Sequence, residues 1–188
     1  MFIFRWYAGF LLGLAMLIPD GSSAQEATPV GGEDSTVFIL VERPDQVTIV
    51  DLGTPGKSAG DLTVWGPNPL YDEANAVDTG AMTHGSCMSL NTAGDNHCTE
   101  TVLFADGSTL EIQGIQRGSG EPSLTTIVGG SGEYRGATGT VVVDPSADYQ
   151  TWTKTFEVVM PANNSFNKNS GSPVSRAAQQ LEVVKRRT

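Results

Sequence analysis

The chain of 188 residues has only two cysteines, two histidines, and 11 lysine and arginine residues against 21 aspartate and glutamate residues. Two cysteines are too few for a disulfide-scaffold miniprotein or for a zinc site of four thiolates. The net charge of −10 argues against electrostatic binding to the phosphate backbone of a nucleic acid, so no nucleic-acid partner is expected. With 39% hydrophobic residues, the chain is not a disordered polymer. What remains is an acidic chain whose length suits one domain.

No apolar run reaches the ~20 residues that a membrane-spanning helix needs. The longest run, residues 6–18, follows Arg5, ends at a Pro-Asp-Gly sequence and is succeeded by small residues before Gln25. This pattern predicts a signal peptide over residues 1–24 and a secreted or otherwise extracytoplasmic protein with no stable membrane span after cleavage. An uncleaved membrane anchor is the alternative.

Residues 36–160 contain short segments rich in Val, Ile, Thr, Leu and aromatic residues, separated by Gly, Pro, Asn and Asp. This is the pattern of successive strands, and no segment favours a helix. The strands are expected at residues 36–42, 46–51, 61–65, 82–90, 98–104, 109–117, 123–128, 139–144 and 151–160. Strands without helical crossovers predict an all-β fold, either an antiparallel sandwich or a closed barrel, and closure would remove exposed strand edges.

Two polar segments flank this predicted domain. Residues 25–35 read as a flexible leader, and residues 161–188 read as a polar and then basic tail. The tail has five basic residues and one acidic residue, whereas residues 25–160 have five basic and nineteen acidic ones. The tail could therefore dock on the acidic body or make an electrostatic contact with a partner.

Cys87 and Cys98 flank a turn-forming Asn-Thr-Ala-Gly-Asp-Asn sequence. In a hairpin centred on that turn the two cysteines lie opposite each other, which predicts a cross-strand disulfide in an oxidising compartment. A metal site that adds His84 and His97 is an alternative, but the spacing matches no standard zinc pattern. A reactive thiol is a third interpretation. The disulfide is the prediction, with no metal and no cofactor.

Several local motifs together resemble the allene oxide cyclase and dirigent superfamily. The resemblance rests on Gly60-Asp61-Leu62, Asn68-Pro69-Leu70-Tyr71-Asp72, Gly85-Ser86-Cys87, Phe104-Ala105-Asp106-Gly107 with Gln113-Gly114, and above all the glycine-rich segment Ile127-Val128-Gly129-Gly130-Ser131-Gly132-Glu133-Tyr134-Arg135-Gly136-Ala137-Thr138-Gly139. It implies an eight-stranded antiparallel β-barrel with an inner cavity for a small hydrophobic molecule. Members of the superfamily form dimers and trimers, so a homo-oligomer is among the expectations.

The resemblance also suggests site residues. Trp65 and Asn68 match an aromatic residue and an asparagine that assist catalysis in plant allene oxide cyclases, and Cys87 matches the cysteine of the Gly-x-Cys strand. The family's first-strand glutamate falls near Ile39, and its later tyrosine falls near Gln116, so both are missing at the aligned positions. Trp65, Asn68 and Tyr71 are the expected ligand-binding residues.

Three functions follow from these observations. The leading hypothesis is an exported barrel that binds and orients a small hydrophobic or phenolic compound, as dirigent proteins do. The first alternative is an isomerase or cyclase acting on a lipid-like or polyketide-like substrate, with Asn68 polarising an oxygen and Trp65 shaping the apolar pocket. The second alternative is a structural cell-surface module without a ligand.

Overall fold

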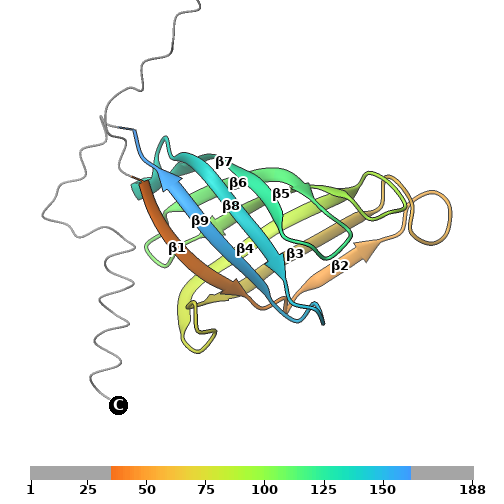
Figure 1. The fold of residues 1–188 in the computed structure, drawn as a ribbon, viewed down its shortest axis with the longest axis horizontal. Coiled ribbons are helices and arrows are strands. Elements are labelled where there is room, and N and C mark those ends of the chain that lie inside the picture. Colours follow the sequence, from red (N-terminus) through yellow and green to blue (C-terminus); the bar gives the residue numbers. More distant parts are fainter. Residues whose placement is uncertain (1–34, 162–188) are drawn as a thin grey trace, which may run out of the picture. The chain divides into compact units, whose positions relative to one another are not determined.

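The computed structural model describes residues 35–161, and all structural statements below concern those residues. The signal peptide expected over residues 1–24 lies outside them, as do residues 25–34 of the expected leader and residues 162–188 of the expected tail. The described chain forms nine strands and one short 3-10 helix (Figure 1). They are β1 (Ser35–Glu42), β2 (Val47–Val50), β3 (Leu62–Tyr71), β4 (Asp78–Ser89), β5 (Asn96–Leu103), β6 (Thr109–Gln116), β7 (Ser123–Ser131), η1 (Gly132–Tyr134), β8 (Thr138–Pro145) and β9 (Trp152–Val159).

The strands form one antiparallel sheet that closes on itself. From β2 to β9 each strand pairs with the next one along the chain, and β9 pairs with β1. β1 then pairs with the second half of β3 through Val41–Tyr71 and Glu42–Leu70, which closes a barrel of eight strands. β2 pairs with the first half of β3. The expected eight-stranded antiparallel barrel is therefore confirmed.

β3 is longer than the strand expected over residues 61–65. It continues through a cis Gly66–Pro67 peptide bond to Tyr71, and its register against β4 shifts between Trp65 and Asn68. A proline has no backbone N–H to give to a ladder, so strand patterns end at proline. The irregularity accommodates Pro67 and lets the strand resume on its far side.

A carboxylate organises the turn between β2 and β3. Asp61 accepts hydrogen bonds from the backbone N–H groups of Leu52 and Ser58 at 2.9 and 2.7 Å, and from the Ser58 hydroxyl. The two backbone hydrogen bonds hold the pKa of the Asp61 carboxyl below its usual range. Asp61 thus acts as a turn residue, as its position beside Gly60 suggests.

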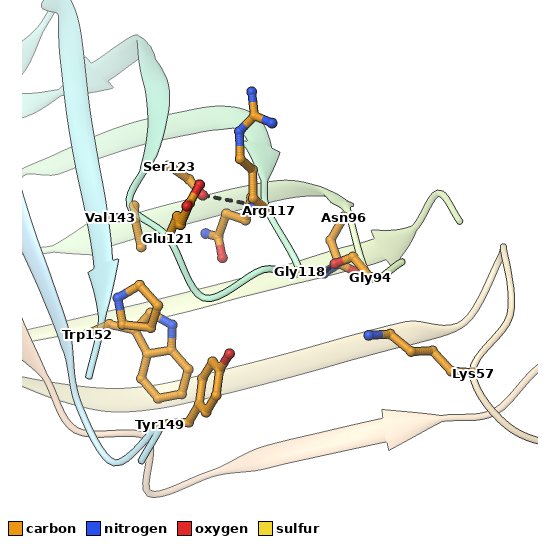
Figure 2. A pocket seen from close by; sticks show the side chains of 12 residues that line it. Lys57, Gly94, Asn96, Arg117, Gly118, Glu121, Ser123, Val143, Tyr149 and Trp152 are labelled. Atoms are coloured by element: carbon orange, nitrogen blue, oxygen red, sulfur yellow. Dashed lines mark hydrogen bonds between the residues drawn. The ribbon is translucent and has the colours of Figure 1, made fainter. Parts of the chain in front are cut away.

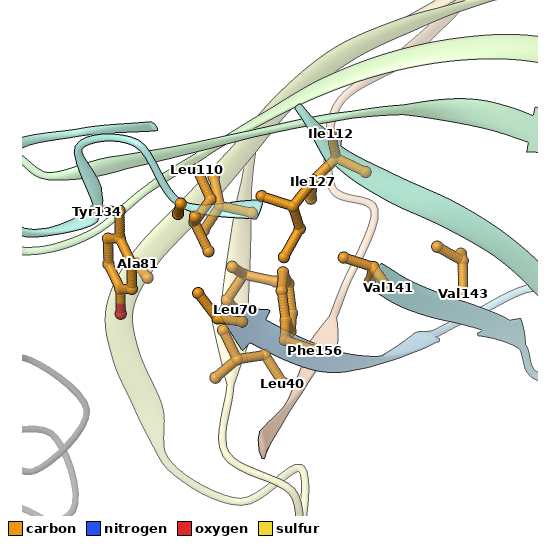
Figure 3. Packing of buried hydrophobic residues seen from close by; sticks show 13 residues of the cluster. Leu40, Leu70, Ala81, Leu110, Ile112, Ile127, Tyr134, Val141, Val143 and Phe156 are labelled. Carbon is orange, nitrogen blue, oxygen red and sulfur yellow. The ribbon is translucent and has the colours of Figure 1, made fainter. Parts of the chain in front are cut away.

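Apolar side chains fill one end of the barrel. Alternate residues of each strand face inward, as the two-residue period of a strand requires. The Phe156 ring stacks on Phe38 with centroids 4.7 Å apart, and Phe104 stacks on Tyr134 at the same distance. Figure 3 shows Phe156 among Leu40, Leu70, Ile127 and other buried aliphatic residues. No helix within residues 35–161 has the length and apolar character needed to cross a membrane.

Candidate functional site

A pocket of about 270 Å³ opens at the other end of the barrel, where β5, β7 and β9 begin and β6 and β8 end. Figure 2 shows its walls, which come from strand ends and from the turns that join them. The lining residues are Lys57, Gly94, Asn96, Gln116, Arg117, Gly118, Glu121, Ser123, Val143, Pro145, Tyr149 and Trp152. We call this space the mouth pocket.

Two aromatic rings form one wall of the mouth pocket. Trp152 begins β9, and Tyr149 lies in the β8–β9 turn, with the ring centroids 6.1 Å apart and the planes tilted by 50°. Tyr149 has φ of 55°, a left-handed conformation that non-glycine residues rarely adopt, and its side chain is 50% exposed. Its hydroxyl lies against Gly120 of the β6–β7 turn. The turn thus holds an exposed aromatic side chain across the pocket opening.

Hydrogen bonds within the turns hold both the aromatic and the polar walls. Ser146 accepts from the backbone N–H groups of Gln150 and Thr151 at 3.1 and 3.0 Å, and its carbonyl accepts from the Tyr149 N–H at 2.9 Å. On the polar side, the Ser123 hydroxyl accepts from the Arg117 N–H at 2.9 Å. The pocket therefore combines aromatic surface with preorganised polar groups, a common combination in small-molecule sites.

Three charged side chains are buried inside the barrel beyond the mouth pocket. Lys154 of β9 lies between Glu42 of β1 and Glu100 of β5, and these residues are 1%, 5% and 3% exposed. Lys154 Nζ is 2.6 Å from Glu42 Oε2 and also contacts Glu100 Oε1. Asn68 and Thr83 donate to Glu42 Oε1 at 2.7 and 3.0 Å. We call Glu42, Glu100 and Lys154 the ionic cluster.

The three groups of the ionic cluster respond differently to burial. Desolvation raises the pKa of Glu100 above its usual range. The charge and hydrogen bond of Lys154 offset this only in part, and the charge of Glu42 adds to the rise. Desolvation opposes ionisation of Glu42 as well, but the Lys154 charge and three side-chain hydrogen bonds outweigh it and lower the Glu42 pKa. For Lys154, desolvation is outweighed by the two carboxylates, so its pKa is raised.

The residues expected at a ligand site lie in different surroundings. Trp65 faces the interior over Gly85, and its buried indole N–H has no hydrogen-bond partner among the described residues. Asn68 is 1% exposed and held by Glu42 and by the Gln46 N–H. Tyr71 carries the Arg43 guanidinium 3.6 Å above its ring. The lining of the mouth pocket includes none of the three.

The inner cavity that the resemblance implies stays a prediction. In the middle of the barrel, Lys154, Phe156 and Leu70 are almost completely buried and occupy the interior. The mouth pocket lies at the end of the barrel. A ligand that uses it would contact Trp152 and Tyr149 first.

The predicted disulfide between Cys87 and Cys98 is present. The two cysteines are cross-strand partners in the β4–β5 hairpin, as its central turn suggested. Because each sulfur is bonded to the other, neither is a free thiol or a metal ligand. The interpretations of the pair as a metal site and as a reactive thiol are therefore wrong for this structure.

Sequence reasoning did not identify the ionic cluster or the mouth pocket. The family's first-strand glutamate was aligned near Ile39, whereas the structure brings Glu42 of that strand to Asn68. One available signal was the alternation of Trp152, Lys154 and Phe156, which puts the lysine on the same strand face as two aromatic residues. No comparable signal marked Glu100.

The geometry is that of a closed eight-stranded antiparallel barrel with a pocket of about 270 Å³ at one end. Similar solved structures are a pyocyanin demethylase (21% identity, 65% of this chain and 99% of that chain, TM-score 0.57) and a pterocarpan synthase dirigent protein (22%, 68% and 84%, 0.54). Another is the Diels Alderase AbmU from Streptomyces koyangensis (16%, 79% and 81%, 0.53). The chain has the fold of the dirigent and allene oxide cyclase-like barrels, which confirms the predicted resemblance at the level of fold. No protein-family model and no curated protein matches the sequence.

Proposed function

We propose that this protein is an exported barrel that binds a small aromatic compound in the mouth pocket and holds it in a fixed orientation. The observation that carries the proposal is the pairing of Trp152 with Tyr149 on one wall of a pocket of about 270 Å³. Tilted and offset rings attract each other, and each such contact contributes about 0.5 to 1.5 kcal/mol beyond area burial. A planar ligand would contact these rings and meet Gln116 and Asn96 on the polar side.

Two further observations support this function. The similar solved structures carry names for chemistry on small organic molecules, a demethylase, a pterocarpan synthase and a Diels Alderase. In addition, left-handed backbone at a non-glycine residue such as Tyr149 is concentrated in proteins at ligand-binding and active sites. Trp65, Asn68 and Tyr71 would then support the barrel wall rather than form the first contacts with the ligand.

Export is the second part of the proposal. The predicted signal peptide over residues 1–24 would carry the chain out of the cytoplasm, and disulfides such as Cys87–Cys98 persist mainly in oxidising compartments. The test is fractionation of cells that express the full chain, followed by N-terminal sequencing. A mature N-terminus at Gln25 outside the cytoplasm is expected, and an intact N-terminus inside the cytoplasm would refute export.

Binding can be tested by fluorescence because residues 25–188 contain two tryptophans, Trp65 and Trp152. In a Trp65→Phe variant, Trp152 is the remaining reporter. We expect planar phenolic compounds to quench it in a saturable way, and Trp152→Ala to weaken binding by about tenfold, measured by calorimetry. Leu124→Ala, on the exposed outer face of β7, is the matched control and should leave affinity unchanged.

The same experiment separates the proposed function from its alternatives. Recovery of the bound compound without chemical change agrees with an orienting role, whereas a rearranged product would favour an isomerase. Absence of saturable binding across a panel of phenolic, polycyclic and lipid-like compounds would refute the proposal and favour a structural module.

A further inference from the structure

The ionic cluster is unusual because two carboxylates share one ammonium group inside a closed barrel. Moving a charge from water into a protein interior costs several kcal/mol for each ion, and attraction between partners offsets this only when their charges are matched. Here Glu42 and Glu100 both face Lys154, so full ionisation leaves one negative charge without a counter-ion among the three. A buried cluster of this kind is stabilised if charged groups become neutral.

The three side chains are also arranged for a reaction with one another. Lys154 Nζ, an amine nitrogen, contacts the Glu100 carboxyl, and Glu42 Oε2 is 2.6 Å from the same nitrogen. Glu42 is itself fixed by Asn68 and Thr83, whereas the carboxyl of Glu100 is hydrogen-bonded to Lys154. A nucleophile, a carboxyl carbon and a proton-transfer group therefore meet at one point, with their positions set by β9, β5 and β1.

We propose that Lys154 and Glu100 condense to an intramolecular amide bond that links β9 to β5 across the barrel interior, with Glu42 transferring the proton. Glu42 takes a proton from the Lys154 ammonium, and the neutral Nζ attacks Cδ of protonated Glu100. The N–C bond forms, Glu42 returns this proton to the departing hydroxyl, and the C–O bond breaks. Glu42 then takes the second proton from Nζ, so the product is a neutral amide beside a protonated Glu42. One water molecule leaves, and no oxidation or reduction takes place.

The barrel interior favours this step in two ways. In water, an amine and a carboxylic acid are stabilised as ions, which opposes amide formation. Burial removes the hydration of these ions, and the raised pKa of Glu100 keeps its carboxyl in the acid form that the reaction needs. The pKa of Lys154 is raised and that of Glu42 is lowered, so these two groups rest as an ammonium and a carboxylate, and the amine forms only when a proton passes between them. Permanent contact between the reacting groups supplies an effective concentration far above that of separate molecules. The reaction is independent of ligand binding in the mouth pocket.

The mass of the purified chain tests the proposal. After the two hydrogens lost in the Cys87–Cys98 disulfide are accounted for, the intact protein should be lighter than its sequence by one water molecule. After reduction, trypsin should leave residues 58–117 joined to residues 136–168, because an amide on Lys154 blocks cleavage there. A mass equal to the disulfide-bonded sequence would overturn the proposal. Joined peptides that have lost ammonia instead of water would also overturn it, since that would identify Asn68, in the same peptide as Glu100, as the partner.

A pair of variants tests the role of Glu42. Glu42→Gln should have the mass of its disulfide-bonded sequence without loss of water, because the proton-transfer carboxylate is gone. The matched control, Glu157→Gln on the exposed face of β9, should still lose one water molecule. Loss of water in Glu42→Gln at the wild-type extent would refute the role of Glu42. If Glu42→Gln does not fold, the joined peptides of the wild-type protein still decide whether the bond exists.

Discussion

The disulfide makes a quantitative prediction about stability. Cys87 and Cys98 are 11 residues apart in the sequence, so reducing the bond opens a loop of about a dozen residues in the unfolded chain. The chain-entropy relation for a loop of that length gives a loss of about 2.8 kcal/mol in the free energy of unfolding. This is a large share of the roughly 5 to 15 kcal/mol that stabilises a typical domain.

The assay is urea denaturation of the oxidised protein, of the reduced protein and of a Cys87→Ala/Cys98→Ala variant. We expect the midpoint to fall by on the order of 1 M in both modified forms, since urea slopes of about 1 to 3 kcal/mol per M are usual. The control is Ser86→Ala/Thr99→Ala, the neighbouring cross-strand pair without a covalent bond, which should change stability by about 0.5 kcal/mol or less. A loss below about 1 kcal/mol on reduction would refute the loop-entropy reasoning.

Three further predictions concern the barrel itself. Phe156 is 0% exposed, so Phe156→Ala should lower the free energy of unfolding, measured by urea denaturation, by about 3 to 5 kcal/mol. The control is Val128→Ala, at a residue that is 57% exposed, and it should change this free energy by about 0.5 kcal/mol or less. The lowered pKa of Asp61 stabilises the fold at pH values above the unfolded-state pKa, and this stabilisation is lost as the pH falls through the folded-state pKa. Asp61→Asn should therefore make the denaturation midpoint depend less on acid pH, and an unchanged dependence would contradict the hydrogen bonds that Asp61 makes in the turn. Gly85→Ala should lower the melting temperature and shift the Trp65 fluorescence spectrum, because the added methyl group collides with the indole ring, and an unaltered spectrum would contradict that packing.

Much of the barrel could be predicted from local patterns. The Asp106-Gly107 turn lies between two strands, and the period of two in residues 151–159 matches the inward and outward faces of β9. The second half of β3 was missed because Pro67 normally ends a strand pattern, and its accommodation depends on a register shift against β4.

The sites were harder to predict for a physical reason. A charged residue in a strand is usually solvent-exposed, so Glu100 reads as an outward residue until its partner is known. That partner, Lys154, is 54 residues away, and the two meet across the barrel. The mouth pocket likewise brings together residues as far apart in the sequence as Lys57 and Trp152. These residues become neighbours only when the barrel closes, and no single segment of the sequence predicts that contact.

Whether the mouth pocket is the binding site can be read from the indole N–H signals of Trp65 and Trp152 in a two-dimensional NMR spectrum. On titration with a planar phenolic compound, the Trp152 signal should move in a saturable way, because its ring lines the pocket. The Trp65 signal should move much less, since its N–H is buried and Trp65 does not line the pocket. A Trp152 signal that stays in place while Trp65 moves, or two signals that both stay in place, would contradict the claim.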